Sequence, residues 1–132
     1  MNVFVDTSAF YAVVDADDLN HARAKRTWIE LLDQQGVLVC TNYVLVETFA
    51  LLQHRLGLPA VRAFEADAVP VLQIEWVGEI QHRSAVAALL AASKRNLSLV
   101  DCVSFEVMRQ SGLTTAFAFD PDFARQGFHT IP

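Results

Sequence analysis

The sequence contains few of the residues that bind zinc or form disulfides. It has two cysteines in 132 residues, Cys40 and Cys102, and each lies in an apolar stretch outside any C-x-x-C pair. A disulfide framework and a cysteine zinc site are therefore disfavoured, and we expect two buried, reduced thiols. The four histidines are scattered and form no H-E-x-x-H motif, which excludes that zinc-hydrolase pattern.

Glycine and proline are also scarce, with five and four residues respectively. No linker-like stretch and no internal repeat divides the chain, so we predict a single domain over residues 1–132. No apolar run reaches the roughly 18 residues of a membrane helix, and the first residues lack the basic start of a signal peptide. We therefore expect a cytoplasmic protein.

Apolar residues, in contrast, are abundant. The chain is 53% hydrophobic and its mean hydropathy is +0.29, which is high for a small protein with much surface to cover. We therefore predict that a partner covers part of the apolar surface and that the protein is oligomeric.

The net charge of −5 argues at first against a nucleic-acid partner, because phosphate binding usually leaves a basic footprint. Two divalent cations held by four of the acids would bring this charge to −1. A local basic rim could then meet RNA, although each rim residue is explained equally well as a solvated helix residue. The candidates for the rim are Arg23, Lys25, Arg26, Lys94 and Arg95.

Apolar runs alternate with helical patterns along the chain. We predict strands at residues 2–6, 37–40, 71–77, 114–119 and 128–131, and helices at 18–34, 42–56, 59–67, 79–94 and 98–112. Strands separated by helices pair in parallel through right-handed crossovers. The predicted fold class is α/β, a three-layer α/β/α sandwich with a mainly parallel sheet. In the helix at 18–34 we expect an inward face of Leu19, Ala22, Trp28, Leu31 and Leu32.

Four acidic residues lie where such a sheet would bring them together. Asp6 and Asp120 each follow an apolar strand, Asp101 lies three residues after Ser98 in a first helical turn, and Glu47 lies in an apolar helical stretch. Each aspartate alone is explained as a helix cap, whereas few polar residues surround the glutamate. All four positions open onto the carboxyl edge of the sheet, where α/β proteins bind ligands. We therefore expect the four carboxylates to converge.

Converging carboxylates require a cation or protons. Two such charges about 4 Å apart repel by roughly 4 kcal/mol at an effective dielectric constant of about 20. A ligand set made only of oxygens favours Mg²⁺ or Mn²⁺ over zinc and copper. Because magnesium usually takes phosphate oxygens as further ligands, the predicted chemistry is phosphodiester hydrolysis.

At these residues the chain resembles the PIN-domain nucleases, and among them the VapC-type ribonuclease toxins of prokaryotic toxin–antitoxin pairs. The resemblance spans nearly the whole chain, and its segments match in order and spacing. They are VDTSA at residues 5–9, VLVETFALL at 44–52, SLVDCVSF at 98–105 and AFDPDF at 118–123.

Proteins similar to this chain bind Mg²⁺ or Mn²⁺ and cut RNA endonucleolytically, often tRNA or ribosomal RNA. The resemblance implies that the metal ligands and catalytic residues here are Asp6, Glu47, Asp101 and Asp120. It further implies that water attacks phosphorus in line, so that products carry 5′-phosphate and 3′-hydroxyl ends.

One position departs from the toxin pattern. The residue two after Asp120 is often histidine in the toxins, and here it is Asp122. It either adds a fifth carboxylate to the metal site or serves as an acid in a first helical turn. Ser8 and Ser104 are expected to support neighbouring carboxylates by hydrogen bonds, or else to cap and pack helices.

The resemblance also implies partners, namely a second copy in a homodimer and a small antitoxin. The predicted helices between residues 43 and 67 are the candidate surface for a partner, and a role in the core explains them equally well. Two alternatives remain for the function. The chain could be a PIN-fold RNA-processing nuclease outside a toxin–antitoxin pair, or a catalytically idle binding protein with the same fold.

Overall fold

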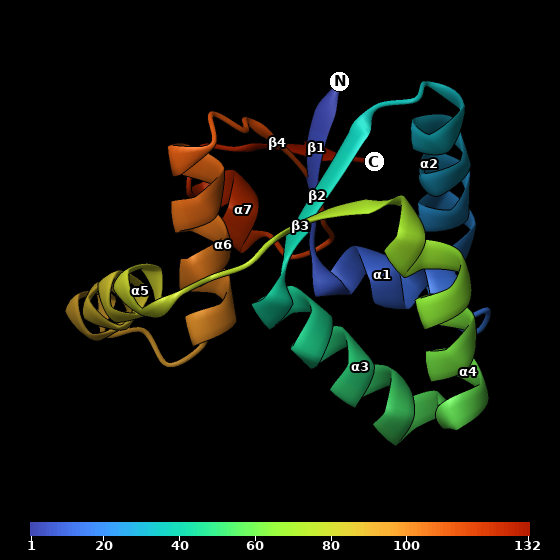
Figure 1. Cartoon of the computed structure of the whole chain (residues 1–132), viewed down its shortest axis with the longest axis horizontal. Helices are drawn as coiled ribbons and strands as arrows, with labels where there is room; N and C mark the ends of the chain where they lie inside the picture. The colour runs from blue at the N-terminus through green and yellow to red at the C-terminus, as the bar shows by residue number, and fades with distance from the viewer.

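Five parallel strands form the centre of the computed structural model, which describes all 132 residues (Figure 1). They lie in the order β3-β2-β1-β4-β5, so the first strand of the chain occupies the middle of the sheet. Every pairing is parallel, because a helix between successive strands returns the chain to the same end of the sheet. The strands are β1 (Asn2–Val5), β2 (Val37–Thr41), β3 (Leu72–Glu75), β4 (Thr115–Phe117) and β5 (His129–Ile131).

Helices cover both faces of this sheet. Figure 1 shows α6 and α7 on one side of the strands and α1, α2 and α4 on the other, which confirms the predicted α/β/α sandwich. No helix combines the length and the apolar character needed to cross a membrane. The helices are α1 (Thr7–Val14), α2 (His21–Asp33), α3 (Asn42–Leu56), α4 (Leu58–Ala63), the π-helix η1 (Phe64–Ala68), the 3₁₀-helix η2 (Val69–Val71), α5 (Glu79–Ala92), α6 (Leu99–Gln110) and α7 (Asp122–Arg125).

Several predicted elements have other bounds in the structure, among them the strand predicted at residues 71–77 and the helix predicted at residues 59–67. The strand predicted at residues 71–77 ends at Glu75, because the next free backbone N–H, that of Val77, donates to the Asn42 side chain at 2.7 Å. The helix predicted at residues 59–67 changes from α to π geometry partway along. Neither change moves the elements that carry the acidic residues.

The core is a cluster of 27 buried apolar residues on both faces of the sheet. Phe123, in the F-D-x-x-F element, is fully buried. Its ring lies 5.0 Å from that of Phe105 on α6 and 6.2 Å from that of Phe4 on β1. These contacts join α7 to α6 and to the central strand. Both cysteines are buried free thiols, as predicted.

The predicted inward face of the helix after residue 18 is partly wrong. Leu19 is 97% exposed, because α2 begins only at His21 and Leu19 lies in the turn before it. The residues that α2 buries are Ala24, Thr27 and Leu31. Of the five residues predicted to face inward, Leu31 is buried and Trp28 is half-buried, whereas Ala22 and Leu32 are exposed like Leu19. Only one of the five predicted inward residues, Leu31, therefore belongs to the buried face of α2.

Phe123 is fully buried and Leu19 is exposed, so truncating them should affect stability to very different extents. Phe123→Ala should lower the free energy of unfolding by about 3–5 kcal/mol, because it removes a ring from a packed aromatic cluster. Leu19→Ala should change it by less than about 0.5 kcal/mol, since the side chain is already solvated. Urea unfolding of both variants measures the difference. A loss above about 1 kcal/mol in Leu19→Ala would restore the inward face predicted from sequence.

Candidate metal centre

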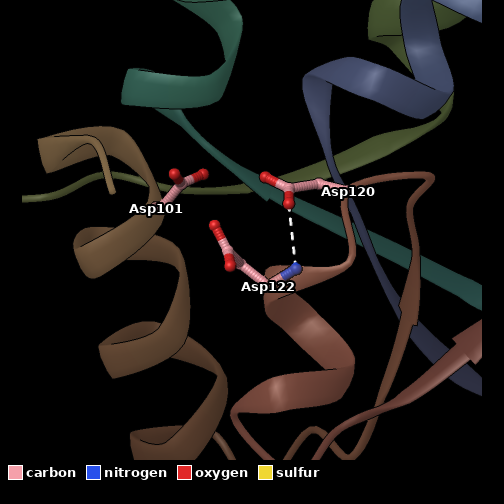
Figure 2. A group of neighbouring side chains, drawn as sticks. All are labelled: Asp101, Asp120 and Asp122. Atoms are coloured by element: carbon pink, nitrogen blue, oxygen red, sulfur yellow. Dashed lines mark hydrogen bonds between the residues drawn. The ribbon is translucent and has the colours of Figure 1, made fainter. Parts of the chain in front are cut away.

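Three carboxylates approach one another at the carboxyl edge of the sheet (Figure 2). One oxygen from each of Asp101, Asp120 and Asp122 lies within 4.8 Å of the other two. Asp101 comes from the first turn of α6, Asp120 from the loop after β4, and Asp122 from the first position of α7. We call these three residues the acidic trio. Their donor set contains only oxygen, and it therefore fits a hard divalent cation.

The loop after β4 holds two members of the trio together. The backbone N–H of Asp122 donates to Asp120 Oδ1 at 2.9 Å, which is the dashed line in Figure 2. This bond closes a short Asx turn directly before α7, whose N-cap position is Pro121. The remaining oxygen of Asp120 has no hydrogen-bond partner in the protein. A structural role at the start of a helix and a ligand role are therefore compatible at this residue.

Asp101 combines the same two roles. Ser98 N–H donates to Asp101 Oδ2 at 3.1 Å, and Asp101 N–H donates to Ser98 Oγ at 3.0 Å. These two bonds form a capping box. The box occupies only Oδ2, and it fixes the carboxylate in an orientation toward Asp120 that Figure 2 shows. The cap interpretation is thus correct, and it leaves one oxygen for a cation.

Asp6 lies beside the trio in a more buried position. It directly follows β1, is only 4% exposed, and accepts hydrogen bonds at Oδ2 from Ser8 N–H at 3.2 Å and from Ser8 Oγ at 2.6 Å. The same Ser8 oxygen accepts the N–H of Phe119 at 3.0 Å. Phe119 was predicted to be the last residue of a strand, but β4 ends at Phe117 and this N–H turns to Ser8 instead. Ser8 therefore ties Asp6 to the chain just before Asp120.

The acids destabilise one another's charged forms. Burial raises the pKa of Asp6 to about 6, and the charges of Asp101 and Glu47 add to this effect against the two Ser8 hydrogen bonds. Burial also raises the pKa of Asp101, as do the charges of Asp120 and Asp122. A bound cation would relieve both the desolvation and the repulsion.

Glu47 occupies α3 and is half-buried. Burial raises its pKa, and the charges of Asp101 and Asp120 act in the same direction. Glu47 and Asp6 thus interact electrostatically with the trio but do not belong to its group of mutually close oxygens. The sequence placed four acids at this edge, and the structure groups Asp122 most tightly with two of them.

The second predicted supporting serine has a different role. Ser104 is buried, and its hydroxyl donates to the carbonyl of Val100 at 2.9 Å, one turn earlier in α6. Ser104 therefore contacts no carboxylate, and its role is helix packing.

A buried pair of threonines beneath the site was not predicted from the sequence. Thr48 donates to Thr7 Oγ1 at 3.1 Å, and Thr7 donates to the Val44 carbonyl at 3.3 Å, so α3 is hydrogen-bonded to α1. Their positions directly after Asp6 and Glu47 were the available signal. The role of Arg125 beside the site was not predicted either, and its Nη1 lies 2.7 Å from Asp122 Oδ1. An i, i+3 pair of opposite charges could have indicated it.

The raised pKa of Asp6 predicts a pH dependence of the metal-free protein. The pKa of Asp6 is about 6 in the folded protein and 3.8 in the unfolded chain. Between these two pH values the folded protein holds a proton that the unfolded chain has lost, so stability falls as the pH rises through this range. Asp6→Asn removes the titration while keeping a capping side chain. In EDTA, the free energy of unfolding of Asp6→Asn relative to that of wild type should rise by up to about 3 kcal/mol between pH 4 and pH 7.

Urea unfolding across this pH range measures the growth. Glu79→Gln is the matched control, because it also removes one carboxylate, but one at an exposed ion pair with Arg83. Its stability relative to wild type should stay nearly constant with pH. A constant difference for Asp6→Asn as well would contradict the assigned cause.

Comparison with known proteins agrees with this geometry. The PIN domain family matches residues 3–129. The chain is 39% identical over 127 residues to the 23S rRNA-specific endonuclease VapC20 of Mycobacterium tuberculosis, in each of two strains. This match covers 96% of the chain and 95% of VapC20.

Two solved structures share the fold. The crystal structure of Mycobacterium tuberculosis VapC20, described as a toxin that cleaves the sarcin-ricin loop, has a TM-score of 0.84 at 38% identity, over 96% of this chain and 95% of that one. FitAcB from Neisseria gonorrhoeae has a TM-score of 0.71 at 13% identity, over 100% of this chain and 97% of that one, and supports the fold alone. The chain therefore belongs to the PIN-domain family and is a VapC-type endoribonuclease.

Proposed function

We propose that this endoribonuclease uses Mg²⁺ or Mn²⁺ held by Asp101, Asp120 and Asp122, with Asp6 and Glu47 completing the acidic site. The observation that carries the proposal is the mutual approach of the three trio oxygens within 4.8 Å. Such an approach is unfavourable for free carboxylates and favourable around a hard cation. The absence of any nitrogen or sulfur ligand supports this choice of ions over zinc.

Hydrogen bonds within the chain would orient the acids before a substrate arrives. The Asp122 amide holds Asp120, the Ser98 amide holds Asp101 and the two Ser8 donors hold Asp6. Each of these three acids is held through one oxygen only, so the other oxygen stays available. When bound, the metal would lower the pKa of a water molecule and neutralise charge on the phosphate. Asp6 carries a proton below about pH 6 in the metal-free protein, so acid should weaken metal binding.

We propose further that the substrate is ribosomal RNA and that the enzyme is the toxin of a type II toxin–antitoxin pair. Identity of 39% to a 23S rRNA-specific endonuclease over 96% of the chain supports the first point. Prokaryotic ribosomes are cytoplasmic, so the proposed place of action is the cytoplasm. A primer-extension assay on intact ribosomes should then find one dominant cut in 23S rRNA, whereas distributed cuts or a preference for tRNA would count against this substrate.

Exposed apolar surface supports the proposed partners, a homodimer and an antitoxin. Trp76 is 73% and Ile80 84% exposed, and covering them would be favourable. In addition, an apolar groove of about 250 Å³ lies between α1, α2 and η1, with Trp28 and Phe64 in its lining. Of the surface predicted between residues 43 and 67, α4 buries no residue and remains available, while α3 buries part of its apolar face in the core.

The two roles of Asp101 can be separated experimentally. Asp101→Asn should abolish cleavage and reduce the rise in melting temperature that Mn²⁺ produces, since it removes a ligand charge while Asn still accepts the capping bond. The metal-free variant should be at least as stable as wild type, because one repelling charge is gone. Ser98→Ala is the matched control, which should cost about 1 kcal/mol as a lost cap and keep the Mn²⁺ response.

Melting curves of the three proteins with and without Mn²⁺ measure both effects. A destabilised Asp101→Asn protein with a wild-type Mn²⁺ shift would show that Asp101 is only a cap.

Metal dependence and product chemistry provide a separate prediction. EDTA should abolish RNA cleavage, and added Mg²⁺ or Mn²⁺ should restore it, because the bound metal would lower the pKa of the attacking water and neutralise charge on the phosphate. Water attack with the 3′-oxygen as leaving group should yield 5′-phosphate and 3′-hydroxyl ends, which end-labelling and mass spectrometry identify. Products with 2′,3′-cyclic phosphate would show that the RNA hydroxyl is the nucleophile.

A further inference from the structure

A basic cleft of about 370 Å³ opens beside the acidic trio. Its lining includes Lys94, Arg95, Arg125, Gln126 and the trio residue Asp122. The cleft thus gathers three of the ten lysines and arginines of a chain whose net charge is −5. Asp122 belongs both to the cleft and to the trio, so the two sites are adjacent.

Two of the three cations in the cleft have no acidic partner. The ion pairs of the structure are Arg83 with Glu79 and Arg125 with Asp122, and neither involves Lys94 or Arg95. A turn presents these two residues between α5 and α6, closed by a hydrogen bond from Leu97 N–H to the Lys94 carbonyl at 3.2 Å. Leu97 packs against the core and anchors the turn. The charges of Lys94 and Arg95 therefore form no ion pair within the protein.

The other wall of the cleft also presents donors. Arg125 uses Nη1 for Asp122, and the rest of its five N–H groups remain for a ligand. The side-chain oxygen Oε1 of Gln126 accepts a hydrogen bond from Arg109 Nη2 at 2.8 Å, which leaves the side-chain N–H groups of Gln126 free. The one carboxylate in the lining, that of Asp122, is paired with Arg125. A site with ammonium, guanidinium and amide donors and a neutralised acid is suited to a phosphate group.

We propose that this cleft binds the RNA backbone phosphate next to the one that is cut. The inference rests on the proposed function for its ligand, since an RNA chain with one phosphate at the trio must place its next phosphate nearby. Through Asp122, Arg125 connects the two positions. The cleft would contribute to RNA affinity and to the position of the chain on the enzyme, while the acids carry the chemistry.

The test uses Lys94→Gln/Arg95→Gln in the full chain and a fluorescein-labelled single-stranded RNA, with binding measured by anisotropy in EDTA. Loss of one phosphate contact should lower the salt dependence, the slope of log K against log salt, by about 0.7 and weaken binding about fivefold at 0.1 M salt. In Mg²⁺, KM should rise while kcat stays within about twofold, as expected for a contact made equally in the ground and transition states.

Two control variants make the test specific. Lys25 and Arg26 were also candidates for the basic rim, but they occupy exposed positions on α2 and do not line the cleft. Lys25→Gln/Arg26→Gln therefore removes the same two residue types from outside the site and should leave both the affinity and the slope unchanged. Lys94→Arg/Arg95→Lys keeps both charges and should bind as wild type. Its failure to do so would assign the effect to a damaged turn and overturn the proposal.

The remaining outcomes are equally decisive. An unchanged slope in the cleft variant, or an equal loss in the α2 variant, would overturn the phosphate site. So would a cleft variant that keeps RNA binding but no longer binds its antitoxin, because the cleft would then serve a protein partner. A wild-type protein that binds RNA through the cleft but never cuts it would overturn the proposed function and leave the site standing.

Discussion

The parallel pairing of β1 with β4 is the constraint on which the site depends. Phe4 and Val5 align with Ala116 and Phe117, and the N–H of Asp6 continues the ladder to the Phe117 carbonyl at 3.1 Å. β4 ends at Phe117, and beyond it the Ser8 hydroxyl links the two segments, because it donates to Asp6 and accepts the N–H of Phe119. Two acids about 114 positions apart in the chain thereby reach the same edge of the sheet, and α6 needs only to pack beside them to add Asp101.

Helix capping and metal ligation draw on the same residues in this fold. The first turn of a helix leaves N–H groups unpaired, and a carboxylate satisfies them with one oxygen. In a parallel sheet many of those first turns lie at the carboxyl edge, so capping acids are already near one another. Asp101 and Asp120 each accept a backbone N–H with one oxygen, and this bond restricts the side chain to one conformation. Metal binding would then cost less side-chain conformational entropy. Stability and function are therefore not competing explanations for these acids.

Opposite charges are segregated along this edge. The trio concentrates negative charge, and the neighbouring cleft concentrates Lys94, Arg95 and Arg125. Arg125 lies at the boundary, paired with Asp122. This arrangement explains how a chain with a net charge of −5 can act on a polyanion, because the local field around a site matters more at short range than the net charge.

The sequence by itself determined the fold class, most element positions and four of the acidic residues at the edge. Periodicity and strand–helix alternation carry this information, since they reflect which faces each element must bury. It did not determine the side of α2 that is buried, because Leu19 is apolar and yet lies before the helix begins. Only the tertiary structure decided that Asp122 joins Asp101 and Asp120 and that Lys94 and Arg95 meet Arg125. Those groupings depend on how α7 packs against α6 through Phe123 and Phe105, a contact between distant segments that no local pattern encodes.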